Sequence, residues 1–135
     1  MPEQLFPWMQ LIGRILFSMM FIGSGMMRLF KLNDMAAYAQ TRGAPAPKAA
    51  TVVTGLIMLV GGVLVLLGWH RFIGAGLIAI VVLLTAFTLH GFWKETDPVV
   101  KQNEMSHFLK DLALCGAALL VAVYAGIEWP MSLGG

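Results

Sequence analysis

Two histidines, a tryptophan, a lysine and an aspartate gather in one short polar segment of an otherwise apolar chain. The segment TLHGFWKETDPVVKQNEMSHFLKD covers residues 88–111 and separates two long apolar runs. An aromatic face beside histidine and lysine donors suits a quinone headgroup, which is flat, polar at its carbonyl edges and delivered from the bilayer. The residues behind this hypothesis are His90, Trp93, His107, Lys110 and Asp111. In the competing interpretation they only anchor helix ends and need no ligand.

Two arginines in the first apolar run, Arg14 and Arg28, complete the set of candidate ligand or quinone-site residues. An arginine inside an apolar span is costly unless it is paired, hydrated or able to reach the interface. At about 100° per residue, Ser18, Phe21 and Gly25 share a helix face with both arginines, and this face should point into a helical bundle. Arg14 then either reaches the outer interface and ties helix ends together or contacts a ligand, and the sequence leaves both readings open.

A second stripe of polar and small residues is predicted on the fourth apolar run. Its members lie within about 40° of one another on a helix; they are His107, Asp111, Cys115, Ala118 and Ala122. If the first and fourth helices are antiparallel, Asp111 lies level with Arg28, and Glu128 lies level with Arg14. The two helices could then form two ion pairs with each other. Glu128 is about 100° around the helix from Asp111, so both pairs cannot be ideal in a straight helix.

The elements that position these residues are predicted to be transmembrane helices. The chain of 135 residues is 59% hydrophobic and 12% charged, which is too little polar surface to cover a soluble globule. Four apolar runs come close to the roughly 20 residues that span a bilayer core; they cover residues 5–29, 49–67, 72–89 and 108–127. Because the runs do not alternate, a barrel is disfavoured. We expect one all-α domain, residues 1–135, built as a four-helix transmembrane bundle.

Both connections on one side of the membrane carry helix signals. In KLNDMAAYAQTRGAPAPKAA, Asn33 suits a helix cap, Asp34 suits a first turn and Gly43 suits a helix end. A short interfacial helix is therefore expected between the first and second spans. In the third connection, Asp97 before Pro98 predicts a capped helix start that runs on into the fourth span.

Several functions and partners are disfavoured by composition. The single cysteine, Cys115, rules out an internal disulfide or a Cys-x-x-Cys redox pair. The histidines lack the spacing of a known haem or metal motif, so no metal site is expected. Ten methionines fit adaptable packing better than copper binding. The net charge of +2 says little about partners; we expect the lipid bilayer as a partner and no nucleic acid.

The order of motifs along the chain resembles that of a known family. The motifs are GRILFSMMFIGSGMMRLF, RGAPAPKAA, TGLIMLVGGVLVLLGWHR, HGFW and HFLKDLALCGAALLV. Over nearly the whole chain this order is similar to the DoxX family of small bacterial inner-membrane proteins. The most specific parts are Arg14, the Gly61-Gly62 pair of the second helix, His90 with Phe92 and Trp93, and Phe108-x-Lys110 leading into Leu-Ala-Leu. Arg28 stands where the family pattern usually has Lys, and Asp111 where it often has Asn.

The resemblance implies a multi-pass protein of the bacterial inner membrane. The family is named for a subunit linked to thiosulfate oxidation with quinone as acceptor, and relatives are associated with membrane complexes that handle thiol and oxidative stress. It thus implies a small component of a redox or quinone-linked system, with quinone as the candidate cofactor and an oxidoreductase subunit as the candidate partner. The alternative is a non-catalytic scaffold or assembly factor, and catalysis itself is left open because no nucleophile, metal cluster or cofactor motif is visible.

The basic residues predict how the chain is oriented in the membrane. They concentrate in the first and third connections; the residues are Arg28, Lys31, Arg42, Lys48, Lys94, Lys101 and Lys110. Both termini should then face the periplasm, and a C-terminal fusion to a reporter that works only in the cytoplasm should be silent. A working reporter would invert the assignment.

Overall fold

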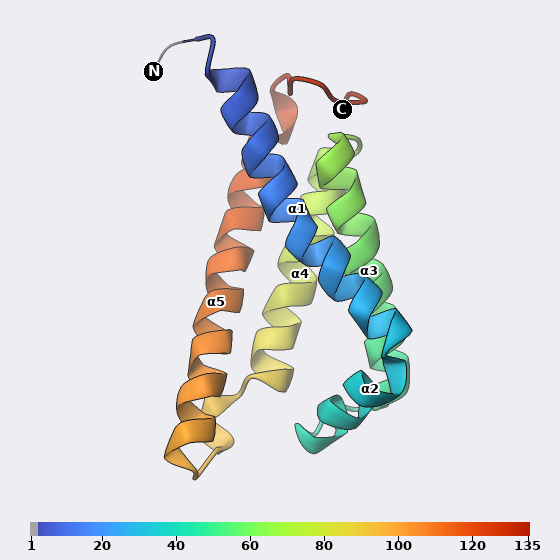
Figure 1. Cartoon of the computed structure of the whole chain (residues 1–135), viewed down its shortest axis with the longest axis vertical. Coiled ribbons are helices and arrows are strands. Elements are labelled where there is room, and N and C mark those ends of the chain that lie inside the picture. The colour runs from blue at the N-terminus through green and yellow to red at the C-terminus, as the bar shows by residue number, and fades with distance from the viewer. Residues whose placement is uncertain (1–2) are drawn as a thin grey trace.

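Four long helices make up most of the computed structural model, which describes residues 3–135 (Figure 1). They are α1 (Phe6–Phe30), α3 (Pro47–Leu67), α4 (Arg71–Leu89) and α5 (Pro98–Val123). Within the described residues, these four helices supply the segments long and apolar enough to cross a membrane. The predicted all-α four-helix transmembrane bundle is therefore confirmed.

Three shorter helices join or extend the long ones. They are α2 (Leu32–Thr41), η1 (Phe92–Lys94) and η2 (Tyr124–Gly126). The short helix expected between the first two spans is thus α2, with Asp34 in its first turn and Gly43 just beyond its end at a φ of 79°. The expected cap is wrong, because Asn33 lies inside the helix and no side chain caps its start.

The fourth helix starts well before the predicted apolar span at 108. Asp97 caps it, accepting hydrogen bonds from the backbone nitrogens of Val99 at 2.8 Å and Val100 at 3.4 Å. Pro98 occupies the first turn, where its missing N–H costs nothing. The polar N-terminal half of α5 and the apolar span are therefore parts of one rigid helix, and His107 and Asp111 lie near its middle.

The four long helices pack as a chain of neighbours, so that the first and the last do not pack on each other. α1 packs on α3, α3 on α4, and α4 on α5, whereas α1 and α5 do not pack along each other. In Figure 1, α1 crosses the bundle diagonally, so its start lies nearer α5 than its end does. We call the end that holds the start of α1 and the C-terminal segment the terminal end, and the opposite end, beside α2, the α2 end.

Close contact between α1 and α3 depends on two glycines. A Cβ atom built on Gly25 would lie 2.7 Å from the carbonyl oxygen of Gly55 and 2.8 Å from the backbone nitrogen of Leu59. The buried residues of α1 are Arg14, Ser18, Phe21 and Gly25. The predicted inward stripe is confirmed at these four positions, and its glycine lets the two backbones touch.

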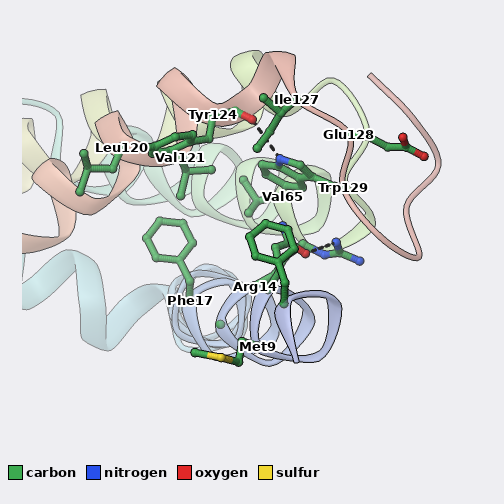
Figure 2. Close-up of a pocket in the computed structure, with 13 residues that line it drawn as sticks. Met9, Arg14, Phe17, Val65, Leu120, Val121, Tyr124, Ile127, Glu128 and Trp129 are labelled. Carbon is green, nitrogen blue, oxygen red and sulfur yellow. Dashed lines mark hydrogen bonds between the residues drawn. The ribbon is translucent and has the colours of Figure 1, made fainter. Parts of the chain in front are cut away.

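Arg14 ties three parts of the terminal end together. Its Nε donates to the carbonyl of Leu66 at 2.9 Å, and its two Nη atoms donate to the carbonyls of Pro130 at 2.8 Å and Met131 at 2.7 Å. Nη1 also donates to the side chain of Gln10 at 2.8 Å. The expected partner Glu128 is instead exposed, and its side chain points away from Arg14 (Figure 2). The C-terminal segment brings main-chain acceptors to Arg14 in place of a carboxylate.

Arg71 repeats this arrangement from the start of α4. Its guanidinium donates to the carbonyls of Gly68 and Ile127 and to the hydroxyl of Ser132. The indole of Trp129 is buried against both arginines, with its ring centre 4.8 Å from the Arg71 guanidinium carbon and 5.8 Å from that of Arg14. Two cations and one aromatic ring thus hold the C-terminal segment on the bundle.

Replacing Gly25 with alanine should weaken the bundle, because the new methyl group meets backbone atoms that cannot turn aside. We expect Gly25→Ala to lower the free energy of unfolding by about 1–3 kcal/mol, the usual cost of overpacking. Gly23→Ala is the matched control on the same helix, since a Cβ at Gly23 meets nothing within 4 Å. Thermal unfolding in detergent measures both variants, and equal midpoints would contradict the close α1–α3 contact.

Replacing Arg14 with leucine should leave membrane insertion intact and destabilise the folded bundle. The change removes a charge from an apolar span but leaves three carbonyl groups without their donor. We therefore expect the free energy of unfolding to fall by about 2 kcal/mol or more. Ile15→Leu, at an exposed neighbouring position, serves as the control. An Arg14→Leu protein with unchanged thermal stability would show that these hydrogen bonds contribute nothing to the fold.

Candidate functional site

A cavity of about 370 Å³ lies at the α2 end, between α1, α2, α3, α4 and α5. Five of the seven candidate residues line it: Arg28, His90, His107, Lys110 and Asp111. Apolar walls come largely from methionines, namely Met20, Met27, Met35 and Met58. The cavity therefore combines a polar cluster with an adaptable apolar surface, and its volume lies in the usual range for small-molecule sites.

His90 lies between two carboxylates. It directly follows α4, and its Nδ1 is 2.7 Å from Oε2 of Glu104, while its Nε2 is 3.7 Å from Oδ2 of Asp111. Nδ1 is thus occupied by Glu104, whereas Nε2 has the longer contact to Asp111 and faces the cavity. Nε2 is the atom of His90 that can exchange a proton with a ligand in the cavity.

His107 and Lys110 extend this cluster along α5. The ring of His107 stacks on that of His90 with centres 5.0 Å apart, and Lys110 Nζ lies 3.4 Å from His107 Nδ1. Both residues are exposed, in contrast to the buried Asp111. Donors with spare hydrogen-bonding capacity therefore lie at the outer edge of the cavity, with the buried carboxylate deeper inside.

α2 closes one side of the cavity through two side chains. The hydroxyl of Tyr38 donates to Oε1 of Glu104 at 2.8 Å. Burial, followed by the hydrogen bond to Glu104, raises the pKa of Tyr38 well above its ordinary value, so the phenol stays protonated and keeps donating. Arg42 donates to the carbonyl of Leu89 at 2.6 Å and forms an ion pair with Glu95. α2 is thereby fastened to both α5 and the segment after α4.

Two candidate residues lie outside this cavity. Trp93 belongs to an aromatic cluster, with its ring centre 5.4 Å from Phe108 and 6.0 Å from Phe87. It therefore supports the α4–α5 connection and does not line the cavity. Arg14 lies at the terminal end, where main-chain carbonyls and Gln10 accept its hydrogen bonds. Of its two expected roles, the tying of helix ends is the one its contacts support.

The charge pairs differ from those expected across α1 and α5. Arg28 lines the cavity with Asp111, but its side chain donates to the hydroxyl of Thr54 on α3. The histidine after α4 is the group that faces Asp111. The α2 end therefore centres on His90, because α4 and α5 pack closely while α1 diverges.

Sequence reasoning missed Glu104 and gave Tyr38 no role in the site. A signal for Glu104 was present, since it precedes His107 by three residues and Asp111 by seven, and so shares their face of the helix. Tyr38 gave no comparable signal, because its contact depends on how α2 folds back onto α5. Among residues 3–135, no three His, Cys, Asp or Glu side chains converge in a group that could hold a metal ion.

Comparisons with known proteins agree with the resemblance seen in the motifs. The DoxX family pattern matches residues 9–91, which include Arg28 and His90 and stop before α5. Inner membrane protein YphA of Escherichia coli (strain K12) is 30% identical over 117 residues, which are 87% of this chain and 83% of that protein. No solved structure gives a significant match. With its four apolar helices, the chain is a multi-pass inner-membrane protein that belongs to the DoxX family.

Proposed function

We propose that the protein binds a quinone headgroup in the α2-end cavity and serves as a small component of a membrane redox system. The observation that carries this proposal is the position of His90, held by Glu104 and facing Asp111 inside a cavity lined by Arg28 and Lys110. A bundle that needed only anchored helix ends would have no use for such a cluster beside an open volume.

The chemistry of a quinone matches these groups. Each carbonyl oxygen of a quinone accepts hydrogen bonds. The side chains of Lys110 and Arg28 can only donate them. A quinone that gains two electrons also takes up two protons when it becomes a hydroquinone. His90 and His107 carry ring nitrogens that can pass those protons, with Glu104 orienting the His90 ring. The electrons would pass between the quinone and an oxidoreductase subunit that docks on this protein.

The predicted orientation of the chain in the membrane and the route by which a quinone would arrive fit the same proposal. With both termini in the periplasm, as the basic connections predict, the cavity lies at the cytoplasmic face. Quinones reach such a cavity from the bilayer, and the methionine walls offer an adaptable apolar contact for a flat ring. Holding α2 against Glu104 and Leu89 would keep water from one side of the bound ring.

A binding experiment with a quinone that lacks a tail tests the proposal. The purified protein in lipid nanodiscs is titrated with 2,3-dimethoxy-5-methyl-1,4-benzoquinone, and binding is followed by calorimetry. We expect saturable binding that His90→Ala and Lys110→Ala each weaken about tenfold, as expected for a lost hydrogen bond of about 1.4 kcal/mol. Lys94→Ala is the control, because Lys94 is exposed near the same end and does not line the cavity.

Thermal unfolding of each variant separates lost binding from lost structure. His90→Ala removes a partner of a buried carboxylate and is expected to lower stability, so Lys110→Ala, at an exposed position, is the cleaner test. Absence of saturable binding to a folded wild-type protein would reject the quinone site. The non-catalytic scaffold or assembly factor would then be the better account of the protein.

A further inference from the structure

A smaller cavity, of about 190 Å³, adjoins the α2-end cavity where α3 and α4 pack together. Arg28 and four threonines supply its polar lining, and no carboxylate of residues 3–135 lines it. The threonines are Thr51 and Thr54 from α3 and Thr85 and Thr88 from α4. We call this space the threonine cavity. It shares Arg28, Thr51 and Thr85 with the α2-end cavity, so the two spaces meet at these side chains.

Arg28 keeps most of its hydrogen-bonding capacity, in contrast to the other three arginines of the chain. Arg14, Arg42 and Arg71 each donate from all three guanidinium nitrogens to acceptors of the protein. Within residues 3–135, Arg28 donates only from Nη1, to the hydroxyl of Thr54 at 2.5 Å, and forms no ion pair. Its Nε and Nη2 lie on one edge of the guanidinium with parallel N–H groups, the pair that binds two oxygens of a carboxylate or phosphate.

Two threonine hydroxyls on α4 also have no protein partner. Thr85 is 6% exposed and Thr88 is partly buried, and their spacing of three residues places both on the helix face that lines the cavity. Neither hydroxyl forms a hydrogen bond within residues 3–135, whereas Thr51 and Thr54 donate theirs to carbonyls one turn back on α3, at 2.7 Å each. The Thr85 hydroxyl is open to the cavity, because in this part of the chain only the Ser18 hydroxyl is both unpartnered and fully enclosed. The α4 wall therefore offers donors that the α3 wall does not.

We propose that the threonine cavity binds an oxyanion group, a carboxylate or a phosphate, through Nε and Nη2 of Arg28 and the hydroxyls of Thr85 and Thr88. Donors without acceptors are costly inside an apolar bundle, and an oxyanion satisfies them together with the charge of Arg28. The cavity is smaller than a typical site for a drug-sized molecule, so it holds a small anion or the anionic group of a larger molecule. The site is separate from the proposed quinone site and does not depend on it.

Two sources can supply this oxyanion chemistry, and a simpler account needs neither. A free anion can enter from the aqueous side, and a membrane phospholipid can place its phosphate at the level of the helix ends. In the simpler account, Arg28 donates to Thr54, stabilises the carbonyl end of α1 with its charge and is otherwise hydrated. That account gives the hydroxyls of Thr85 and Thr88 no role in binding any anion.

Valine substitutions test the site, because they remove a hydroxyl and keep the shape of the side chain. The test variants are Thr85→Val and Thr88→Val. Each loses a hydroxyl that has no protein partner, so in chloride alone we expect both to unfold at or above the wild-type temperature. Thr51→Val is the matched control: it lines the same cavity, but its hydroxyl already donates to the carbonyl of Pro47.

The experiment follows thermal unfolding of the lipid-free protein in maltoside detergent. The probes are sodium acetate and sodium phosphate, each against sodium chloride of equal ionic strength, and phosphatidylglycerol against diacylglycerol. A bound probe raises the unfolding midpoint, and the concentration dependence gives an apparent Kd. We expect at least one probe to stabilise the wild type and Thr51→Val alike, and to bind Thr85→Val and Thr88→Val about tenfold more weakly. The general stabilising effect of phosphate acts on every variant, so differences between variants isolate the site.

The outcomes distinguish the two sources and separate this site from the quinone site. Variant-dependent stabilisation by acetate or inorganic phosphate supports the site with a free anion as ligand, and the same result with phosphatidylglycerol alone supports it with a lipid phosphate. Equal shifts in all variants, or no shift beyond the matched control, would overturn the proposal and leave a hydrated arginine. Thr88 lines only the threonine cavity, so Thr88→Val should bind the tail-less quinone as the wild type does. A protein that binds an oxyanion but no quinone would reject the proposed function and keep this site.

Discussion

The arrangement of the bundle depends on how two buried arginines at the terminal end are paired. A guanidinium group inside an apolar environment is tolerated only with a full set of acceptors, and Arg14 and Arg71 obtain theirs largely from main-chain carbonyls. Most of those carbonyls belong to the segment after η2, which has no helix to satisfy them. The arginines and the segment therefore satisfy each other, and Trp129 fills the space between the two cations.

This pairing also determines the path of α1. Arg14 holds the start of α1 near the end of α3 and the C-terminal segment, while Gly25 holds its second half directly against Gly55 of α3. A helix fixed to α3 at both levels cannot also pack along α5. The α2-end cavity and a cavity of about 510 Å³ at the terminal end (Figure 2) are each lined by residues of both α1 and α5.

Sequence reasoning succeeded where the signal is local and failed where it depends on tertiary packing. Hydropathy located the spans, and helical periodicity placed Arg14, Ser18 and Gly25 on one buried face. It did not identify the partners of the charged side chains, because residue types do not reveal which main-chain carbonyls of an irregular segment will face them. Five of the seven candidate residues share one cavity because they lie at helix ends on the same side of the membrane, whereas Trp93 packs on Phe108 and Arg14 belongs to the opposite end.

The two ends of the bundle use their polar groups differently, and this difference bears on function. At the terminal end the arginine donors, the tryptophan N–H and the nearby carbonyls are bound to one another, which stabilises the fold and leaves little capacity for a ligand. At the α2 end Glu104 accepts hydrogen bonds from Tyr38 and His90, but the nearest basic group to Asp111 is Nε2 of His90, at 3.7 Å. A carboxylate kept buried beside a cavity without a close partner contributes little to stability. Asp111 therefore adds little to the fold and, beside the exposed donors of Lys110 and His107, leaves polar capacity facing the cavity.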